Sequence, residues 1–431
     1  MQGNQNWERV CITDVCKSII DCINKTASTV EYPTEFKMIR TTNIRNGWID
    51  LSDVKYVTKE VFERWTRRAI PKKGDVILTR EAPLGEVGMI RTDDKVFLGQ
   101  RLVQYKADPR YLDNKFLLYA FQECDLQSQI KALGSGTSVE HMRVPDAEKL
   151  TLRLPPLSIQ HTIADILSAY DDLIENNRRR IAILEEIAQL IYQEWFVKFR
   201  FPGHKTVKMV ESESGMIPEG WKVAKLSTLL HTQYGYTQSA SEVPIGPKYL
   251  RGMDINKTSS IQWDTVPYCS IDENDYSKYK LAPGDILVIR MADPGKVGIV
   301  EKNIDAVFAS YLVRLHIKSV SISPYYLFYF LLSDRYQSYV SGASTGTTRK
   351  SASAGVITDI DLFLPTDDIR NHFERHISLL RSAINNLLER NVNLRRTRNL
   401  LLPKLISGEL DVSRWVEGEM REDAQCSKLS P

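Results

Sequence analysis

Two long stretches of the chain carry apolar residues at alternating spacings of four and three. This spacing is typical of a coiled-coil seam and predicts two long helices, over 156–200 and 366–407, that pack against each other. Two core helices of an ordinary bundle are the alternative interpretation. The seam positions are Ile163, Leu167, Tyr170, Ile174, Asn177, Ile181, Leu184, Ala188, Ile191 and Trp195 in the first stretch, and Phe373, Ile377, Leu380, Ile384, Leu387, Asn391, Leu394, Arg398, Leu401 and Leu405 in the second.

The chain is also duplicated. KKGDVILTREAPLGEVGMI at 72–90 is echoed by APGDILVIRMADPGKVGIV at 282–300, an offset of 210. The same offset relates LRLP at 152–155 to LFLP at 362–365. GDVIL and GDILV predict buried strands that follow a Gly-Asp turn. We therefore expect an α+β fold in which one α/β globule followed by one long helix occurs twice.

Each seam contains one asparagine, and the two asparagines are not at equivalent repeat positions. In a parallel pair Asn177 and Asn391 would each face an apolar residue. Each buried amide without a hydrogen-bond partner would then cost about 1–3 kcal/mol of stability. In an antiparallel pair in which the numbers of any two facing residues sum to 568, Asn177 lies opposite Asn391 and Trp195 lies opposite Phe373. A buried polar pair can fix the register of a coiled coil. We predict this antiparallel pair, a rod of about 60 Å with pseudo-two-fold-related globules at opposite ends.

These patterns divide the chain into six predicted segments. They are a first globule (1–155), a first spacer helix (156–200), a linker (201–215), a second globule (216–365), a second spacer helix (366–407) and a C-terminal tail (408–431).

Composition narrows the class of protein. Lys and Arg number 57 against 54 Asp and Glu, a net charge of +3, and 42% of the 431 residues are hydrophobic. This balance is typical of a soluble globular protein and excludes a histone-like polycation. The six cysteines form no CxxC pair, and the histidines lack metal-ligand spacing. With no secretory signal visible, we expect reduced thiols, no metal site and a cytoplasmic location.

Motifs for catalysis or cofactor binding are missing. No GxxxxGK[ST] or GxGxxG pattern occurs, and LPPL at 154–157 lacks the Asn or Asp and the aromatic residue of an amino-methyltransferase motif. Asp146, Glu148 and Lys149 superficially resemble a nuclease core, but the second copy does not keep the lysine. We therefore expect no catalytic residue and no cofactor in this chain.

Basic and small polar residues recur at matching places in the two copies. Two similar globules at a fixed separation suit two half-sites on duplex DNA, and Arg beside a Gly-containing loop can reach phosphate or guanine. For Arg80 and Arg290 the alternative is an ion pair with a local acid such as Glu81 or Asp293, and for the loops it is a plain surface turn. The candidate DNA contacts are Arg40, Arg80, Gln100, Arg101, Thr137, Ser138, His141, Arg143, Arg251, Arg290, Lys296, Ser310, Tyr311, Thr347, Thr348, Arg349 and Lys350.

Taken together, these features resemble the specificity (S) subunit of type I restriction-modification systems. The duplicated plan, the helix start LPPLSIQHTIADIL, the helix end EEIAQLIYQEWFVKFRFP, the entry GMIPEGWKVAKL and the closing LLLPKLISGELDV all match. The second helix departs from the pattern because it begins LPTDDIRNHF.

The resemblance implies two target-recognition domains that read a bipartite, asymmetric DNA site. It implies spacer helices that bind two methyltransferase (M) subunits carrying S-adenosylmethionine, and two restriction (R) subunits that use ATP and Mg. The complex would be a site-specific deoxyribonuclease and adenine-specific DNA methyltransferase, and this chain its non-catalytic subunit. Trp195, Phe196, Phe199 and Phe201 would contact partners, or else pack on the chain's own second globule. A stand-alone bivalent DNA-binding protein and a coiled-coil adaptor are the alternatives.

Overall fold

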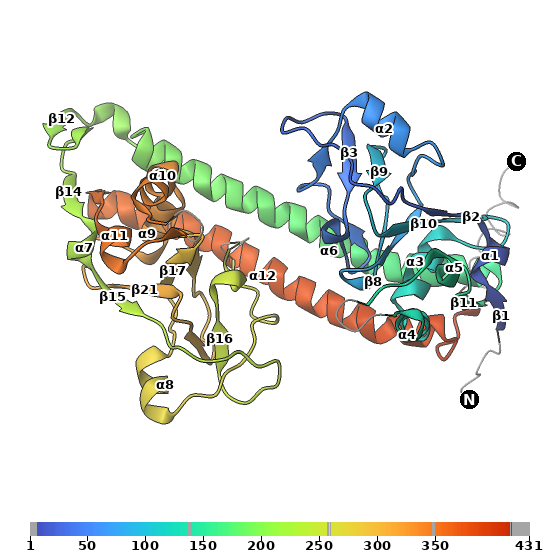
Figure 1. Cartoon of the computed structure of the whole chain (residues 1–431). Coiled ribbons are helices and arrows are strands. Elements are labelled where there is room, and N and C mark those ends of the chain that lie inside the picture. Colours follow the sequence, from blue (N-terminus) through green and yellow to red (C-terminus); the bar gives the residue numbers. More distant parts are fainter. Residues whose placement is uncertain are drawn as a thin grey trace, which may run out of the picture. The chain divides into compact units, whose positions relative to one another are not determined.

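The computed structural model of the chain describes residues 7–135, 140–256, 258, 260–346, 350–413 and 415. These residues belong to two compact units, one formed by residues up to 175 together with those from 393 onward, and the other by residues 176–392. Each unit holds a mixed globule and one part of each of two long helices, α6 (Leu157–Tyr192) and α12 (Asp367–Ile406) (Figure 1). Among the described residues, none of the helices has both the length and the apolar character that crossing a membrane requires.

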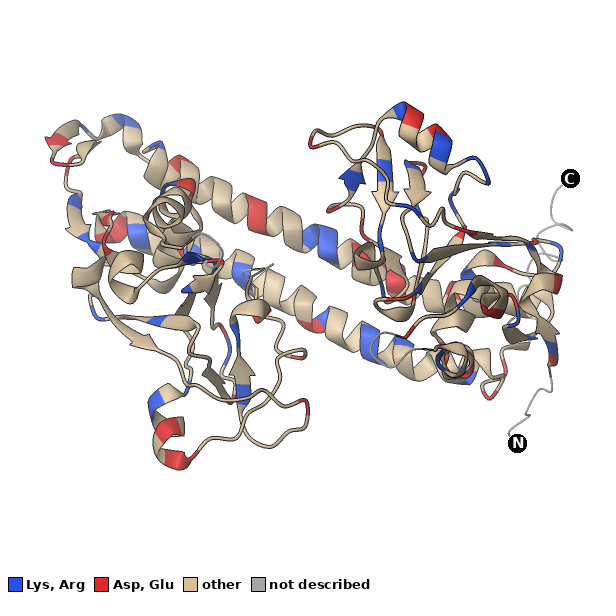
Figure 2. Ribbon diagram, viewed as in Figure 1, with Lys and Arg blue, Asp and Glu red and all other residues tan. Residues whose placement is uncertain are grey.

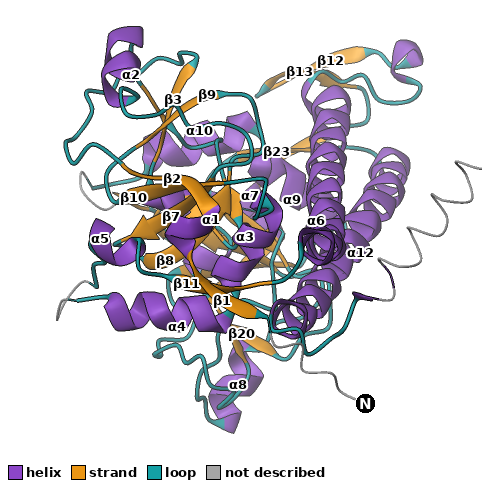
Figure 3. Cartoon of the chain, turned by 90° about the vertical axis from the view of Figure 1, so that its right-hand side faces the viewer, coloured by secondary structure: helices purple, strands orange, loops and turns teal. Residues whose placement is uncertain are grey.

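The globule of the first unit is built around a four-stranded antiparallel sheet in the order β2 (Cys16–Asp21), β10 (Leu102–Ala107), β7 (Val76–Arg80) and β8 (Leu84–Met89). Helix α3 (Asn114–Gln122) packs on this sheet and shares one hydrophobic core with it and with the start of α6 (Figure 3). The smaller sheets pair β1 (Glu8–Cys11) with β11 (Thr151–Leu154), β3 (Phe36–Ile39) with β6 (Lys55–Tyr56) and β9 (Lys95–Leu98), and β4 (Ile44–Arg45) with β5 (Trp48–Ile49). The other helices are α1 (Ile12–Val15), α2 (Lys59–Trp65), α4 (Cys124–Leu133) and α5 (Val144–Ala147).

The second unit repeats this plan. Its four-stranded sheet has the order β15 (Leu230–Tyr234), β21 (Leu312–Ile317), β17 (Ile286–Ile289) and β19 (Val297–Ile299), and α9 (Pro324–Leu332) packs on it. The smaller sheets pair β14 (Lys222–Lys225) with β23 (Asp361–Leu364), β16 (Lys248–Leu250) with β20 (Ala306–Phe308), β18 (Met291–Ala292) with β22 (Lys350–Ser351), and β12 (Met209–Ser212) with β13 (Gly215–Pro218). The other helices are α7 (Leu226–Leu229), α8 (Glu273–Tyr279), α10 (Asp334–Ala343) and α11 (Ala354–Thr358).

The element bounds confirm the duplication. Strands β7 and β17, strands β10 and β21, and helices α3 and α9 begin 210 positions apart, as do α6 and α12. The mixed helix and sheet composition also agrees with the expected α+β class. The division into six segments and the placement of the globules about a rod stay predictions, and the β12–β13 hairpin already begins inside the predicted linker.

The Gly-Asp turns before β7 and β17 have the same geometry. Gly74 and Gly284 have φ of +93° and +96°, a left-handed backbone that favours glycine. The following carboxylates accept hydrogen bonds from backbone amides, Asp75 from Lys72 at 2.8 Å and Asp285 from Ala282 at 2.9 Å. The motif GD therefore closes a turn from which a fully buried strand begins.

The antiparallel helix register is confirmed inside each unit. In the second unit Asn177 Nδ2 donates to Asn391 Oδ1 at 2.8 Å, and both residues are buried. One turn away, Ile181 and Leu387 lie in one apolar cluster, and the Trp195 and Phe373 rings are 6.0 Å apart. In the first unit the predicted partners Ile163 and Leu405 lie in one core.

The prediction that the aromatic end of α6 contacts partner subunits is wrong for its buried residues. Phe196 and Phe201 are 2% exposed and pack against Trp221, with ring centroids 5.8 and 5.5 Å away. Trp195 and Phe199 are only partly buried, but they pack on the same cluster. The alternative, packing on the chain's own second globule, is the correct one.

The asparagine pair allows a direct test of the register. We expect Asn177→Leu to lower the free energy of unfolding by about 1–3 kcal/mol, because the amide of Asn391 would remain buried without its partner. Asn177→Leu/Asn391→Leu should recover most of that loss, since an apolar pair leaves no unpaired amide. Urea titration measures both variants. Equal destabilisation by the single and the double change would contradict the pairing.

Candidate nucleic-acid interface

Five of the predicted DNA contacts line one hollow in the first unit. It has a volume of about 380 Å³ and is formed at the ends of β2 and β7, at the turn before β10, and by the segment that leads into α5. The residues that line it are Asp21, Asn24, Arg80, Glu81, Gln100, Arg101, His141, Arg143, Val144 and Pro145. Sequence reasoning missed Asp21 and Asn24, and it named Glu81 only as a possible ion-pair partner of Arg80.

Arg80 forms the buried wall of this hollow. It is 6% exposed, and its guanidinium donates to Asp21 Oδ1 at 2.8 Å and to the Met142 carbonyl at 3.1 Å. The alternative interpretation, an ion pair with an acid, is therefore the correct one, although the acid is Asp21 rather than Glu81. Because Arg80 is buried and Asp21 balances its charge, we expect it to act on the fold of the globule rather than on DNA.

The accessible groups of the hollow lie around Arg80. Arg101 pairs with Glu81 at 3.3 Å, and half of its side chain is exposed. Gln100 is exposed and accepts a hydrogen bond from the Thr26 hydroxyl at 3.3 Å. An amide, a carboxylate and a guanidinium at one opening can donate to and accept from base edges.

His141 and Arg143 reach the hollow from the chain after the first glycine loop. The His141 backbone exchanges two hydrogen bonds of 3.0 Å with Ser135, which close the base of that loop. Asp146 accepts a hydrogen bond from Arg143 Nε at 2.8 Å and another from Lys149 Nζ at 3.0 Å. These bonds hold the pKa of Asp146 below its usual range. Asp146 is thus an ion-pair partner that supports Arg143. Thr137 and Ser138 lie outside the described residues.

The second unit has Arg290 and Tyr234 where the first unit has Arg80 and Asp21. The strand register sets Asp21 opposite Val103 and Tyr234 opposite Val313, so Tyr234 stands where the first unit has Asp21. The Arg290 guanidinium lies over the Tyr234 ring, 4.7 Å from its centroid. Among the described residues no carboxylate forms an ion pair with Arg290, and the predicted alternative partner Asp293 instead accepts from Asn256 at 2.8 Å. Arg290 therefore carries a positive charge that no described carboxylate balances, whereas Asp21 balances the charge of Arg80.

Other predicted contacts of the second unit are near Arg290. The Arg290 backbone donates to the Tyr311 carbonyl at 2.9 Å and accepts from Ala352 at 2.9 Å, which brings the turn before β21 and strand β22 to the same place. Tyr311, Lys296 and Lys350 are exposed, whereas Ser310 is half-buried. Thr347, Thr348 and Arg349 lie outside the described residues.

Arg40 and Arg251 have structural partners at equivalent turns. Arg251 makes a bidentate contact with the carboxylate of Asp254, with hydrogen bonds of 3.1 and 3.0 Å. Arg40 donates to the Asp53 backbone carbonyl at 2.8 Å. Their backbone amides are also bound by the side chains of Asp254 and Asn43. Both arginines stabilise turns, so we weight them below Arg290 as DNA contacts.

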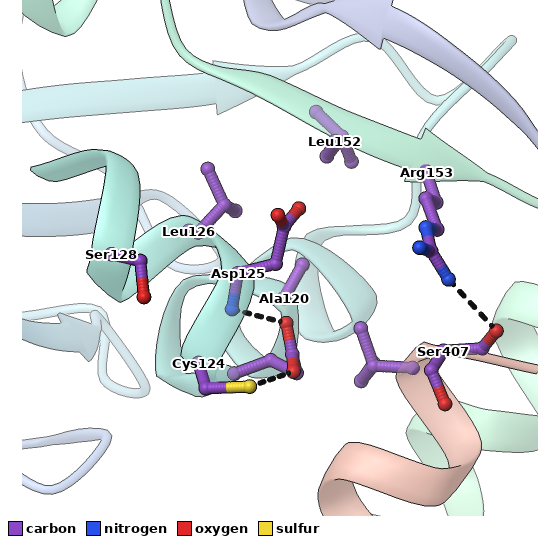
Figure 4. A pocket seen from close by; sticks show the side chains of 10 residues that line it. Ala120, Cys124, Asp125, Leu126, Ser128, Leu152, Arg153 and Ser407 are labelled. Carbon is purple, nitrogen blue, oxygen red and sulfur yellow. Dashed lines mark hydrogen bonds between the residues drawn. The ribbon is translucent and has the colours of Figure 1, made fainter.

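A second hollow of the first unit contains none of the predicted contacts. It has a volume of about 310 Å³ and lies between the start of α4, strand β11 and the end of α12 (Figure 4). The hydrogen bond from Cys124 to Glu123, 2.7 Å long, raises the pKa of the thiol, so Cys124 is a poor nucleophile. Arg153 donates to the Ser407 carbonyl at 3.3 Å across this hollow. Among the described residues no three metal-ligating side chains gather at one place.

Charges of both signs are interspersed over each unit (Figure 2). Neither globule is covered by positive charge alone, in agreement with the net charge of +3. Affinity for a polyanion depends mainly on the number of phosphates that are neutralised. Local cations such as Arg290 therefore matter more here than total charge.

Comparisons with known proteins agree with this geometry. The family model "Type I restriction modification DNA specificity domain" matches residues 4–186. The specificity subunit of the MjaVIII type I restriction enzyme from Methanocaldococcus jannaschii is 28% identical over 425 residues, which cover 95% of this chain and 94% of the relative. The EcoBI specificity subunit from Escherichia coli is 25% identical and covers 75% and 71%, respectively.

A solved structure shares the fold. The S subunit of a type I restriction-modification system from M. genitalium superposes with a TM-score of 0.53 at 17% identity, over 94% of this chain and 98% of that chain. Over most of its length the chain is therefore similar in sequence to type I restriction-modification specificity subunits, and it shares the fold of one of them.

Proposed function

We propose that this chain reads a bipartite, asymmetric DNA sequence, with one globule on each part of the site. The observation that carries the proposal is the pair of equivalent positions at the ends of β7 and β17, where Arg80 is neutralised by Asp21 and Arg290 is stacked on Tyr234. A shared scaffold with different chemistry at one place can hold two specificities. The type I restriction-modification specificity subunits that the chain resembles are non-catalytic, so we assign the chain the step of DNA recognition.

The complex with methyltransferase subunits gives the direct test of recognition. We expect the complex to methylate one split sequence in genomic DNA and to retard duplexes that contain it. Mapping of methylated adenines identifies the sequence, and gel shift at physiological salt measures the preference over random duplex. Binding without sequence preference would overturn the proposal in favour of an adaptor. Selective binding by the chain without any partner would favour a stand-alone DNA-binding protein.

We further propose that the exposed apolar face of α6 receives a methyltransferase subunit. Ile183, Ile187, Leu190 and Val197 are 56%, 39%, 48% and 54% exposed, and they follow one another at helical spacing beside the seam. Contiguous exposed apolar residues mark interfaces in soluble proteins. The repeat-equivalent positions of α12 are mostly polar, with Asn393, Thr397 and Ser407 beside Leu400. We therefore expect two methyltransferase sites of unequal strength.

The remaining partners follow from the same proposal. S-adenosylmethionine would be held by the methyltransferase subunits, and ATP and Mg would be used by two restriction subunits, because this chain carries no sequence motif for these ligands. The assembled complex would methylate adenine or cleave DNA in the cytoplasm. The chain would also depend on its partners for much of its electrostatic affinity for DNA.

Arg290 and Arg80 should respond differently to truncation. We expect Arg290→Ala to weaken DNA binding of the complex by about 1–3 kcal/mol at one half-site, because a cation that no described carboxylate balances is lost. Tyr234→Phe is the matched control, since it keeps the aromatic ring under the guanidinium. Fluorescence anisotropy with duplexes altered in one half at a time measures both. Unchanged affinity for Arg290→Ala would show that it is not a contact.

Arg80→Ala should instead act on folding. It leaves the carboxylate of Asp21 and the carbonyl of Met142 without their donor, so we expect the free energy of unfolding to fall by about 1–3 kcal/mol. Thermal unfolding followed by circular dichroism measures this change. A DNA-affinity loss with no change in stability would restore Arg80 as a direct contact.

A further inference from the structure

Each long helix buries one charged side chain at the same repeat position. Asp171 on α6 has 0% of its side chain exposed and Arg381 on α12 has 1%, and the two residues are 210 positions apart. Buried charges need partners of opposite sign. These two residues carry opposite charges, so their surroundings must differ in sign as well.

In the first unit the buried acid is surrounded by arginines. Arg398 on α12 donates to Asp171 through Nη1, and Tyr119 donates its hydroxyl at 2.7 Å. Arg91 of the globule forms an ion pair with Asp171 at 3.8 Å and stacks over Trp48 at 4.0 Å. Asp171 is thus held by one cation from the opposing helix and one from the globule.

In the second unit the buried arginine is surrounded by acids. Arg381 donates through Nε to Glu301 at 2.9 Å and through Nη2 to the other Glu301 oxygen at 2.5 Å. Glu185 on α6 forms an ion pair with Arg381 at 3.8 Å, and Ser260 bridges the two by hydrogen bonds of 3.3 and 2.8 Å. Arg381 is thus held by one anion from the opposing helix and one from the globule.

The two clusters are charge-reversed copies of each other. Glu301 stands at the repeat position of Arg91, as Arg381 stands at that of Asp171. The opposing helix also reverses its sign, because α6 supplies Glu185 where α12 supplies Arg398. Drift of a duplicated sequence would change single charges, whereas here the charge is reversed at both pairs of repeat positions, 91 with 301 and 171 with 381.

We propose that these charge-reversed clusters are specificity determinants that make α6 pair with α12 and prevent either helix from pairing with its own copy in a second chain. In an antiparallel pair of two α6 helices, Asp171 would face Glu185 of the other chain. In a pair of two α12 helices, Arg381 would face Arg398 of the other chain and Arg395, which stands at the repeat position of Glu185. Like charges placed together in an interface disfavour the wrong partner.

The asparagine pair acts in the same direction. In a pair of two α6 helices with the equivalent register, Asn177 would face Ile181 rather than Asn391. A polar seam residue opposite an apolar one is a known determinant of partner choice in coiled coils. The asparagine layer of the seam and the two charge clusters beside it therefore favour the pairing of unlike helices, whereas the apolar layers would accept either.

This selectivity has a consequence that rests on the proposed function. A specificity subunit that reads an asymmetric site must bring one copy of each globule to the DNA. Pairing of like helices between two chains would produce assemblies with two identical globules, which would read a symmetric site. The clusters would exclude that product.

The test exchanges the charges that the opposing helices supply. In Glu185→Arg/Arg398→Glu the charges that face each other in the native pairing of α6 with α12 become like charges in both clusters. Pairing of like helices between two chains becomes attractive instead, because Asp171 would then face an arginine at position 185 and Arg381 would face a glutamate at position 398. The matched control Glu185→Gln/Arg398→Gln removes the native attraction without creating a new one. We measure molar mass of the full chain by light scattering across concentrations, without DNA or partner subunits, and follow folding by circular dichroism.

We expect the charge-exchanged variant to contain at least about tenfold more dimer than the glutamine control at the same concentration. Equal dimer fractions in the two variants would overturn the proposal. If the double variant does not fold, Glu185→Arg is compared with Glu185→Gln, since Glu185 is partly exposed, and the same difference is required. Because the measurement involves no DNA, its result is independent of whether the chain reads a bipartite site.

Discussion

Replacing Arg381 by methionine should cost about 3–5 kcal/mol of the free energy of unfolding. The substitution keeps an apolar side chain of similar length, but it leaves Glu301, only 8% exposed at its side chain, without its cation. A buried carboxylate without a partner is more costly than the loss of the pair as a whole. Urea unfolding of the full chain, followed by tryptophan fluorescence, measures the change.

Two further variants separate the pair from general damage to the helix. Arg375→Met removes an exposed arginine from the same helix, and we expect a change below about 0.5 kcal/mol. Arg381→Met/Glu301→Gln removes both charges and should recover more than half of the loss. The Arg381 guanidinium also lies over the Phe328 ring, 5.4 Å from its centroid. If the double variant is as unstable as Arg381→Met, the cost comes from packing on this ring and not from the charge of Glu301.

Regular spacing made much of the fold predictable from the sequence. A constant offset of 210 identified the duplication, and α6 and α12 begin within one residue of the expected starts. The partner of Asn177 could also be predicted, because an antiparallel register is the arrangement that leaves neither amide unpaired. Each of these inferences depends on a period, which the chain displays directly.

Contacts between segments distant in sequence were not predictable in this way. Arg80 was predicted to contact DNA or, alternatively, to pair with a local acid such as Glu81, yet its partner Asp21 lies on β2, two strands away in the sheet. The counterpart Tyr234 was missed because the first strands of the two sheets do not follow the offset of 210, so Asp21 and Tyr234 do not align. Only the strand register brings them to one position.

The buried charges show a different reason for failure. Asp171 and Arg381 lie beside the seam, and a charged residue beside a seam is ordinarily solvated. Their burial depends on Arg91 and Glu301 from the globules, which the helix pattern cannot reveal. A signal was nevertheless present in the sequence, since positions 91 and 171 reverse their charge together 210 residues later.

The exposed apolar face of α6 leads to the largest functional effect. We expect Ile187→Asp/Leu190→Asp to abolish binding of a methyltransferase subunit at the α6 site of the full chain, because central apolar anchors of an interface contribute about 2 kcal/mol or more each. A loss of 4 kcal/mol corresponds to roughly a thousandfold change in Kd. Co-purification with the methyltransferase subunit of the native host, followed by titration calorimetry, measures the effect.

Leu379→Asp is the matched control for this change. Leu379 lies on α12 and is 71% exposed, but it belongs to no apolar row like that of α6. We expect it to leave capture unchanged, and we expect both variants to unfold at the same temperature as the native chain because the substituted residues are solvated. Unchanged binding of two methyltransferase subunits by Ile187→Asp/Leu190→Asp would place the docking surface elsewhere. Binding at reduced stoichiometry, with one subunit kept, would instead show that the weaker site on α12 is separate from that on α6.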